Sequence, residues 1–243
     1  MNLIDLAVLG FLTLMALVGW YQGLIRATSM SAAGLVCLLI AALFFGLTAR
    51  SIASDGEILK QLLYYAEGSE MLGGIRVSGL RAGKVSSVLL ERITAGEWTD
   101  PMMPLPAHLA RVFTENVEHA IFAPFGAETL GHYLSYTVAH MTINLVSFTA
   151  VYALAFTVSV LIIRGCDSVF RFPKLRILDG PAGAVMGLAT GYVLLNVLFL
   201  LLPVVQSYLP IAIIYDLVDD SVCCRLFLDS NFLLPFFRGY VAA

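Results

Sequence analysis

The sequence predicts an all-α integral membrane protein with about four transmembrane helices, a large loop domain between helices 2 and 3, and a C-terminal amphipathic helix. Two observations support this fold class. Of the 243 residues, 59% are hydrophobic and only 13% are charged, whereas a soluble domain is typically about 25% charged. In addition, four apolar stretches are long enough to cross about 30 Å of hydrocarbon as helices. With so little surface charge, most of the exterior is expected to face lipid.

The first two spans are the clearest, because neither contains a charged residue. They run from Leu6 to Ile25 and from Ala27 to Ala49. The first is expected to be retained as a helix, since the N-terminus lacks the basic region of a cleaved signal peptide. The third and fourth spans run from about Met141 to Ile163 and from about Ala182 to Leu202. The predicted transmembrane hairpins are therefore residues 1–49 and residues 136–206.

Residues 50–135 are predicted to form a water-exposed or interfacial loop domain. Within residues 50–128 there are seven Lys or Arg and ten Asp or Glu, more than half of the charge in the chain. Glycines and prolines interrupt any long helix there. Two short amphipathic helices are expected, at about 57–67 and about 107–122. In the second, apolar residues recur at helical spacing with charges between them.

The last segment, residues 207–243, is predicted to be an amphipathic tail. Its run from Ile211 to Leu228 includes Asp216, Asp219 and Asp220. Three acids so close together are unfavourable at mid-membrane. We therefore expect a helix on the bilayer surface, and a fifth span is the alternative.

The distribution of basic residues predicts the orientation. Short cytoplasmic loops are enriched in Lys and Arg. Arg26 lies in the turn between the first two spans, and four basic residues lie between the third and fourth spans. Both connections are expected on the cytoplasmic side, which places both termini outside.

Glycines recur every four residues along the fourth span, and a shorter set ends the first span. At this spacing they form a smooth stripe that lets another backbone approach closely. One interpretation is helix packing within the chain; the other is a seam between subunits or the wall of a narrow pore. The glycines concerned are Gly19, Gly23, Gly180, Gly183, Gly187 and Gly191.

Several polar side chains lie in or beside the spans, where they need a partner. Asp5 and Asp179 are expected at the membrane interface, where water satisfies them. Asp179 also precedes the fourth span and can cap its free N–H groups. Asn144, Asn196 and His140 are the polar side chains in or beside the third and fourth spans.

The sequence contains no motif of an enzyme, a metal site or a cofactor site. Glu115 and His119 stand four apart without an HExxH arrangement, and no phosphate loop or nucleophile elbow is present. A net charge of −3 gives no basic patch for nucleic acid. The cysteines are too few and scattered for a disulfide framework, and they are interpreted as structural. The remaining histidines are His108, His132 and His140, and the cysteines are Cys37, Cys166, Cys223 and Cys224.

The order of the short motifs resembles the colicin V production protein (CvpA) family of bacterial inner-membrane proteins. Asn2 and Asp5 precede the first span, which ends in Gly23-Leu24-Ile25-Arg26. Later, Leu175-Arg176-Ile177-Leu178-Asp179 precedes the glycine stripe of the fourth span. The resemblance covers about residues 1–50 and 135–205. Ala27 and Thr190 stand where family members often carry an acid and an arginine.

The resemblance implies a multi-pass protein of the bacterial plasma membrane that supports colicin V production or export, or envelope homeostasis, without catalytic activity. The alternative is a small homo-oligomeric channel or transporter. The expected partner is the lipid bilayer, with a second copy of the chain or an envelope or export protein as further candidates. No cofactor and no nucleic acid are expected.

Overall fold

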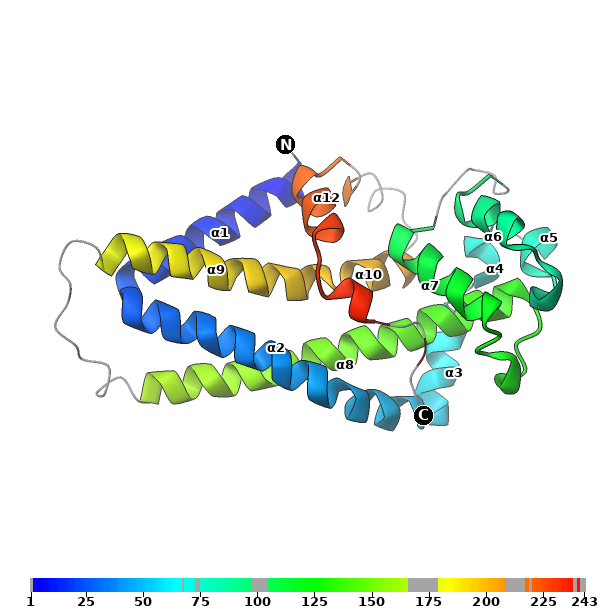
Figure 1. Ribbon diagram of the computed structural model, residues 1–243, viewed down its shortest axis with the longest axis horizontal. Coiled ribbons are helices and arrows are strands. Elements are labelled where there is room, and N and C mark those ends of the chain that lie inside the picture. Colours follow the sequence, from blue (N-terminus) through cyan, green and yellow to red (C-terminus); the bar gives the residue numbers. More distant parts are fainter. Residues whose placement is uncertain are drawn as a thin grey trace. The chain divides into compact units, whose positions relative to one another are not determined.

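The computed structural model describes residues 2–66, 68–72, 75–97, 105–165, 179–208, 217–218, 220–237 and 240. These residues are mostly helical and include no strand beyond an isolated bridge between Arg81 and Thr129. Figure 1 shows the arrangement of the helices.

Four long apolar helices dominate the described part of the chain. They are α1 (Leu3–Gln22), α2 (Leu24–Ala53), α8 (Leu130–Gly165) and α9 (Asp179–Phe199), the last followed by the short α10 (Leu202–Tyr208). By length and composition, α1, α2, α8 and the stretch Asp179–Tyr208 can each cross a membrane. The prediction of a helical membrane protein with four spans is confirmed at this level.

Shorter helices occupy the rest of the described residues. Helices are present at both places where the sequence predicts short amphipathic ones: α3 (Gly56–Tyr65) and α7 (Ala107–Glu118). The predicted tail helix, residues 211–228, lies partly outside the described residues, at 211–216 and 219. A separate short helix, α12 (Val222–Asp229), begins after its cap, Ser221. The others are α4 (Gly68–Met71), α5 (Ile75–Ser78), α6 (Ser87–Thr94) and the 3-10 turns Ala82–Lys84, Ala123–Phe125 and Leu234–Phe236.

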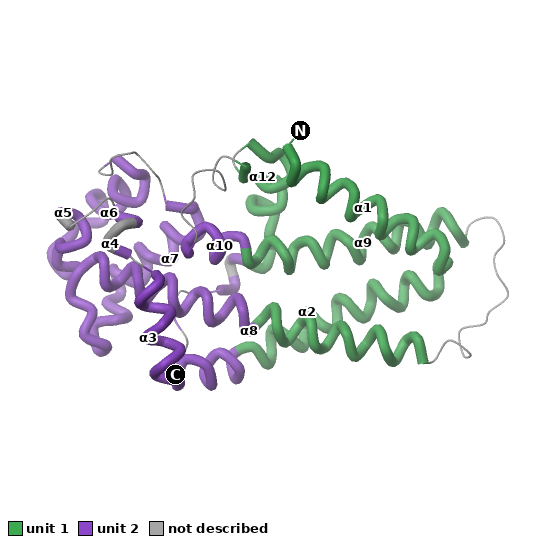
Figure 2. Tube along the Cα trace, turned by 180° about the vertical axis from the view of Figure 1, so that it is seen from behind, with its two compact units in different colours: residues 1–45, 148–201, 211–233 green, residues 46–147, 202–210, 234–243 purple. Residues whose placement is uncertain are grey.

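The chain divides into two compact units, coloured separately in Figure 2. Unit 1 contains residues 1–45, 148–201 and 211–233, and unit 2 contains residues 46–147, 202–210 and 234–243. Helices α2 and α8 therefore contribute to both units.

The core of unit 2 forms where α7 and the first turns of α8 bury their apolar side chains. Leu109 and Phe113 of α7 are fully buried, as are Leu130 and Leu134 of α8. Asn116 of α7 donates from Nδ2 to Thr137 Oγ1 of α8 at 3.1 Å, which satisfies two polar groups inside this core.

Helix α8 is longer than the sequence predicts. It begins at Leu130 rather than near Met141. The extra turns contain Tyr133, Ser135 and Thr137, whose low hydropathy does not predict a membrane span. They are helical because unit 2 buries them: Tyr133 and Thr137 are 2% and 0% exposed. Its 36 residues span about 54 Å, which exceeds the thickness of the hydrocarbon layer.

Candidate functional site

The glycine stripe lies between α1 and α9 of the same chain, in unit 1. A Cβ added to Gly187 would meet the carbonyl oxygen of Met15 and would lie 3.1 Å from Cα of Gly19. A Cβ on Gly183 would meet the carbonyl oxygen of Gly19. Real Cβ atoms do not approach a backbone this closely, so only glycine fits at these positions. The stripe lets two membrane helices pack backbone against backbone.

The two helices are antiparallel along this seam. Met15 lies opposite Gly187 and Gly191, whereas Gly19 lies opposite Gly183 and Gly187. Nearer the start of α9, Gly180 lies against the indole of Trp20. The helices diverge towards the N-terminus of α1, where α12 contacts both of them (Figures 1 and 2). The structure thus places the stripe in an intrachain seam.

The turn between α1 and α2 is a single residue, Gly23. Its φ of 79° and ψ of 168° describe a backbone conformation that residues with a Cβ rarely adopt. A Cβ at Gly23 would also lie 2.6 Å from Oδ2 of Asp179. The position therefore requires glycine both for its backbone angles and for the space that it leaves.

Asp179 caps α2. The backbone N–H of Leu24, the first residue of α2, donates to Asp179 Oδ1 at 2.7 Å. This N–H has no carbonyl partner inside its own helix, and a carboxylate beside it also interacts favourably with the helix dipole. The prediction that Asp179 caps the helix that follows it is corrected in this respect, because the bond runs to α2 and ties the start of α9 to the turn at Gly23.

Asp5 is buried at the start of α1, with 2% of its surface exposed. Its Oδ2 accepts from the backbone N–H of Asn2 at 3.1 Å, which completes a capping box. Its Oδ1 accepts from the hydroxyl of Ser221 at 2.7 Å and from the backbone N–H of Cys223 at 2.9 Å. The expectation that water satisfies Asp5 is wrong, because protein donors occupy both of its oxygens.

Asp5 also brings the N-termini of two helices together. It lies in the first turn of α1 and accepts from the first turn of α12, so the positive ends of both helix dipoles face the carboxylate. Ser221 caps α12 by accepting from the backbone N–H of Cys224 at 3.0 Å. Asn2 adds a further link, because its Nδ2 donates to the carbonyl oxygen of Leu217 at 2.7 Å.

Both thiols of α12 have a raised pKa. Burial raises the pKa of Cys223, and the neighbouring Asp5 carboxylate raises it further. Burial also raises the pKa of Cys224, which is fully buried. A nucleophilic or metal-binding cysteine requires the thiolate, so this environment favours the structural role that the sequence predicts for these two residues.

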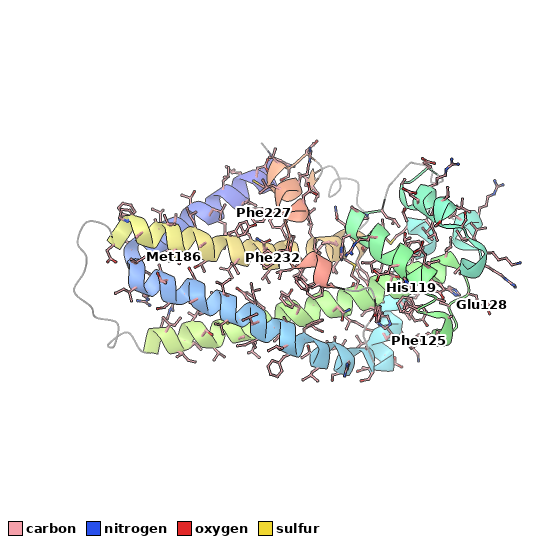
Figure 3. All side chains as sticks on the ribbon, in the orientation of Figure 1. His119, Phe125, Glu128, Met186, Phe227 and Phe232 are labelled. Atoms are coloured by element: carbon pink, nitrogen blue, oxygen red, sulfur yellow. The ribbon has the colours of Figure 1, made fainter. Side chains whose placement is uncertain are left out.

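A second polar contact links α2 to α9 within the membrane-spanning part of unit 1. The hydroxyl of Ser31 lies 2.7 Å from Oγ1 of Thr190 and donates to the carbonyl oxygen of Met186 at 2.9 Å. Figure 3 labels Met186 on α9. Thr190 thus forms an interhelical hydrogen bond between α9 and α2.

Asn196 anchors the chain that follows α12. It is fully buried, and Asn231 donates from Nδ2 to its carbonyl oxygen at 3.1 Å. The Nδ2 of Asn196 donates to the carbonyl of Tyr192 at 2.9 Å, and its Oδ1 has no hydrogen-bond partner among the described residues. Phe227 of α12, labelled in Figure 3, stacks on Phe199 with ring centroids 5.1 Å apart.

The other predicted polar residues lie elsewhere. Asn144 belongs to unit 2, where its Nδ2 donates to the carbonyl oxygen of Tyr240 at 3.1 Å. Asn196 and Asn144 thus belong to different units, Asn196 to unit 1 and Asn144 to unit 2. Arg26 lies in the first turn of α2 and is half-buried. Arg176 lies outside the described residues.

The histidines are dispersed through unit 2. His108 lies beside Arg111, whose Nη2 is 3.3 Å from its Nδ1. Burial, with a smaller contribution from the Arg111 charge, lowers the pKa of His108 to about 4. His140 packs against Phe122, with ring centroids 5.2 Å apart. Among the described residues, no group of three or more His, Cys, Asp or Glu side chains could hold a metal ion.

The contacts among α1, α2, α9 and α12 are here called the junction. Three of its residues were not singled out from the sequence: Ser31, Met15 and Ser221. Ser221 carries a usable signal, since a serine just before a helical stretch is a common cap. Ser31 and Met15 carry none, because a serine or methionine inside an apolar run is ordinary in a membrane helix. Their roles depend on which helix lies beside them.

Comparisons of the chain with protein-family models, with curated proteins and with solved structures find no match.

Proposed function

We propose that the chain is a non-catalytic protein of the bacterial inner membrane, similar to the colicin V production family, that supports production or export of a secreted toxin or maintenance of the envelope. One observation supports this proposal above the others. The segments that carry the resemblance, around Gly23-Leu24 and around Asp179-Gly183, lie far apart in the sequence but contact each other in unit 1. Motif residues that meet in space are what a shared architecture requires.

The bonding of the motif residues supports a structural role rather than a chemical one. Asn2 and Asp5 tie α1 to the segment around α12, and Asp179 ties α9 to α2. Their polar atoms are engaged in holding helices together, so we expect function to depend on the surfaces that the assembled helices present to partners.

The alternative, a homo-oligomeric channel, would use the glycine stripe between copies. The stripe is filled by α1 of the same chain. A channel would therefore need another seam, which makes the accessory protein the better-supported proposal.

The proposal includes an orientation. We infer that residues 50–135 form a loop domain on the outer side, that both termini lie outside, and that the C-terminal amphipathic helix rests on the bilayer surface. Fusion of alkaline phosphatase or green fluorescent protein to the C-terminus tests this. Active phosphatase and dark fluorescent protein are expected, and the reverse pattern would contradict the orientation.

Function is tested by complementation in a colicin V-producing strain that lacks its own family member. We expect the chain to restore secreted toxin, measured as the zone of killing on a sensitive lawn. Toxin activity inside the cells separates a defect in production from one in export. Failure to restore secretion, with normal amounts of the protein in the membrane, would contradict the proposal.

Crosslinking in native membranes separates the two candidates. Capture of a defined envelope or export component would support the accessory role. Capture of copies of the chain alone, in a fixed number, together with ion flux in liposomes that contain the purified protein, would favour the channel.

A further inference from the structure

Helix α3 follows α2 almost without a break. Ser54 and Asp55 are the only residues between the end of α2 at Ala53 and the start of α3 at Gly56. Three Cα–Cα steps span at most about 11 Å. Asp55 caps α3 by accepting from the backbone N–H groups of Glu57 and Ile58 at 3.0 and 3.4 Å. The cap starts a new helix, and Figure 1 shows α3 running across the direction of the end of α2.

The residues of α3 separate into two faces. At 100° per residue, the apolar side chains fall on one side of the helix and the polar ones, together with Tyr64, on the other. No residue of α3 is buried. Ile58 is 40% exposed, and the three leucines are half-buried. The apolar face, which we define as Ile58, Leu59, Leu62 and Leu63, is therefore only partly covered by unit 2.

The end of α2 indicates which solvent lies next to this face. Leu43 and Leu47 are 76% and 62% exposed, as expected for side chains in contact with lipid. The apolar run of α2 stops at Ala49 and is followed at once by Arg50, a pattern typical of the edge of the hydrocarbon layer. A helix that starts within about 11 Å of the end of α2 lies at the level of the headgroups.

We propose that α3 is an interfacial helix whose apolar face binds the phospholipid surface. A short amphipathic helix in this position lies in the membrane plane, with its apolar side chains at the boundary between headgroups and acyl chains. Tyr65, 67% exposed at the edge of the apolar face, suits the headgroup level, where tyrosine is enriched. The inference depends on α2 crossing the membrane and is independent of the proposed function, so either can fail alone.

Photocrosslinking in the full-length protein tests the proposal. The chain is reconstituted into vesicles of phosphatidylethanolamine and phosphatidylglycerol, with p-benzoylphenylalanine in place of Leu63 or of Tyr64. Leu63 belongs to the apolar face and Tyr64, about 100° further around the helix, to the polar face, so each position controls for the other. After irradiation, intact mass reports whether a phospholipid or a protein has been attached. We expect phospholipid adducts at position 63 and few or none at position 64.

A second pair keeps the test decisive if a label at position 63 prevents folding, which circular dichroism and gel filtration would reveal. Ile58 on the apolar face and Lys60 on the polar face take the same label. Lipid adducts confined to positions 58 and 63 support the proposal. Adducts with a second copy or another protein at those positions, equal labelling of both faces, or no lipid adduct would each overturn it.

Discussion

The backbone N–H of Leu24 donates to the carboxylate of Asp179 at 2.7 Å, although 155 positions separate the two residues. This bond uses Oδ1 alone, whereas both oxygens of Asp5 accept hydrogen bonds. The two acids of the junction therefore have different requirements. One acceptor oxygen is sufficient at position 179, whereas position 5 requires two acceptor oxygens.

Replacing Asp179 by Asn is expected to have little effect, because the amide oxygen can still accept from Leu24. Asp179→Ala removes the acceptor and should lower the free energy of unfolding by about 0.5–2 kcal/mol, the usual effect of losing a helix cap. Thermal unfolding in detergent, followed by circular dichroism, measures both. Equal stability of the Ala variant and the parent would contradict the capping role.

Asp5→Asn is expected to destabilise the protein, in contrast to Asp179→Asn. The amide would place an N–H opposite either the N–H of Asn2 or the donors from Ser221 and Cys223, so that two donors face each other. Limited proteolysis should then cut more readily around α12. Ser221→Ala should produce a similar effect, and the double variant should be less than additive because both changes break one network. Strict additivity would show that Asp5 and Ser221 act separately.

Gly187→Ala should separate α1 from α9, because its Cβ would meet the carbonyl oxygen of Met15. Forcing atoms into a packed interface typically costs about 1–3 kcal/mol. Gly10→Ala is the matched control on α1, since nothing lies within 4 Å of its added Cβ, and it should be neutral or slightly stabilising. The two variants are compared by their unfolding in detergent. Similar behaviour of both would show that the seam tolerates a side chain.

Thr190→Val keeps the shape of the side chain and removes its bond to Ser31. We expect a loss of about 0.6 kcal/mol, typical of a hydrogen bond between membrane helices. Thr157→Val is the control, because Thr157 is exposed and bonds within its own helix to Ala153. A larger loss in the control than in Thr190→Val would show that the contact between α2 and α9 contributes nothing.

Unit 2 should lose stability in acid through His108. The folded-state pKa of about 4 lies below the ordinary value of 6.5. The unfolded chain therefore binds a proton below pH 6.5 that the folded chain excludes until about pH 4. Stability should fall by about 1–3 kcal/mol across this window and then level off. His108→Gln should make the loss of stability in acid smaller than in the parent, and His119→Gln on the exposed face should leave that loss unchanged. An unchanged profile in His108→Gln would contradict this origin.

The helices could be predicted from local properties of the sequence. Uncharged runs identify α1 and α2, because burial in lipid imposes the same demand on each residue along a span. The start of α8 was missed, since Tyr133 and Thr137 are made helical by the burial that unit 2 provides. Hydropathy reports contact with lipid, and it underestimates a membrane helix that continues into a protein core.

The site could be predicted only in part. The spacing of Gly183 and Gly187 indicates a close helix contact but does not name the partner, which is α1. The acid at position 5 could be identified as costly in the membrane, but its partner Ser221 lies 216 residues away. Pairings over such distances depend on how the helices assemble, and no local pattern encodes them.

The single-residue turn at Gly23 has a consequence for biogenesis. A ribosome adds about 5–20 residues per second, so Asp179 emerges roughly 8–30 s after Leu24. During this interval the first helical hairpin enters the bilayer with the first N–H of α2 uncapped and the α1 glycines uncovered. The nascent hairpin of α1 and α2 therefore lacks its contacts with α9, which form only after α9 has left the translocon.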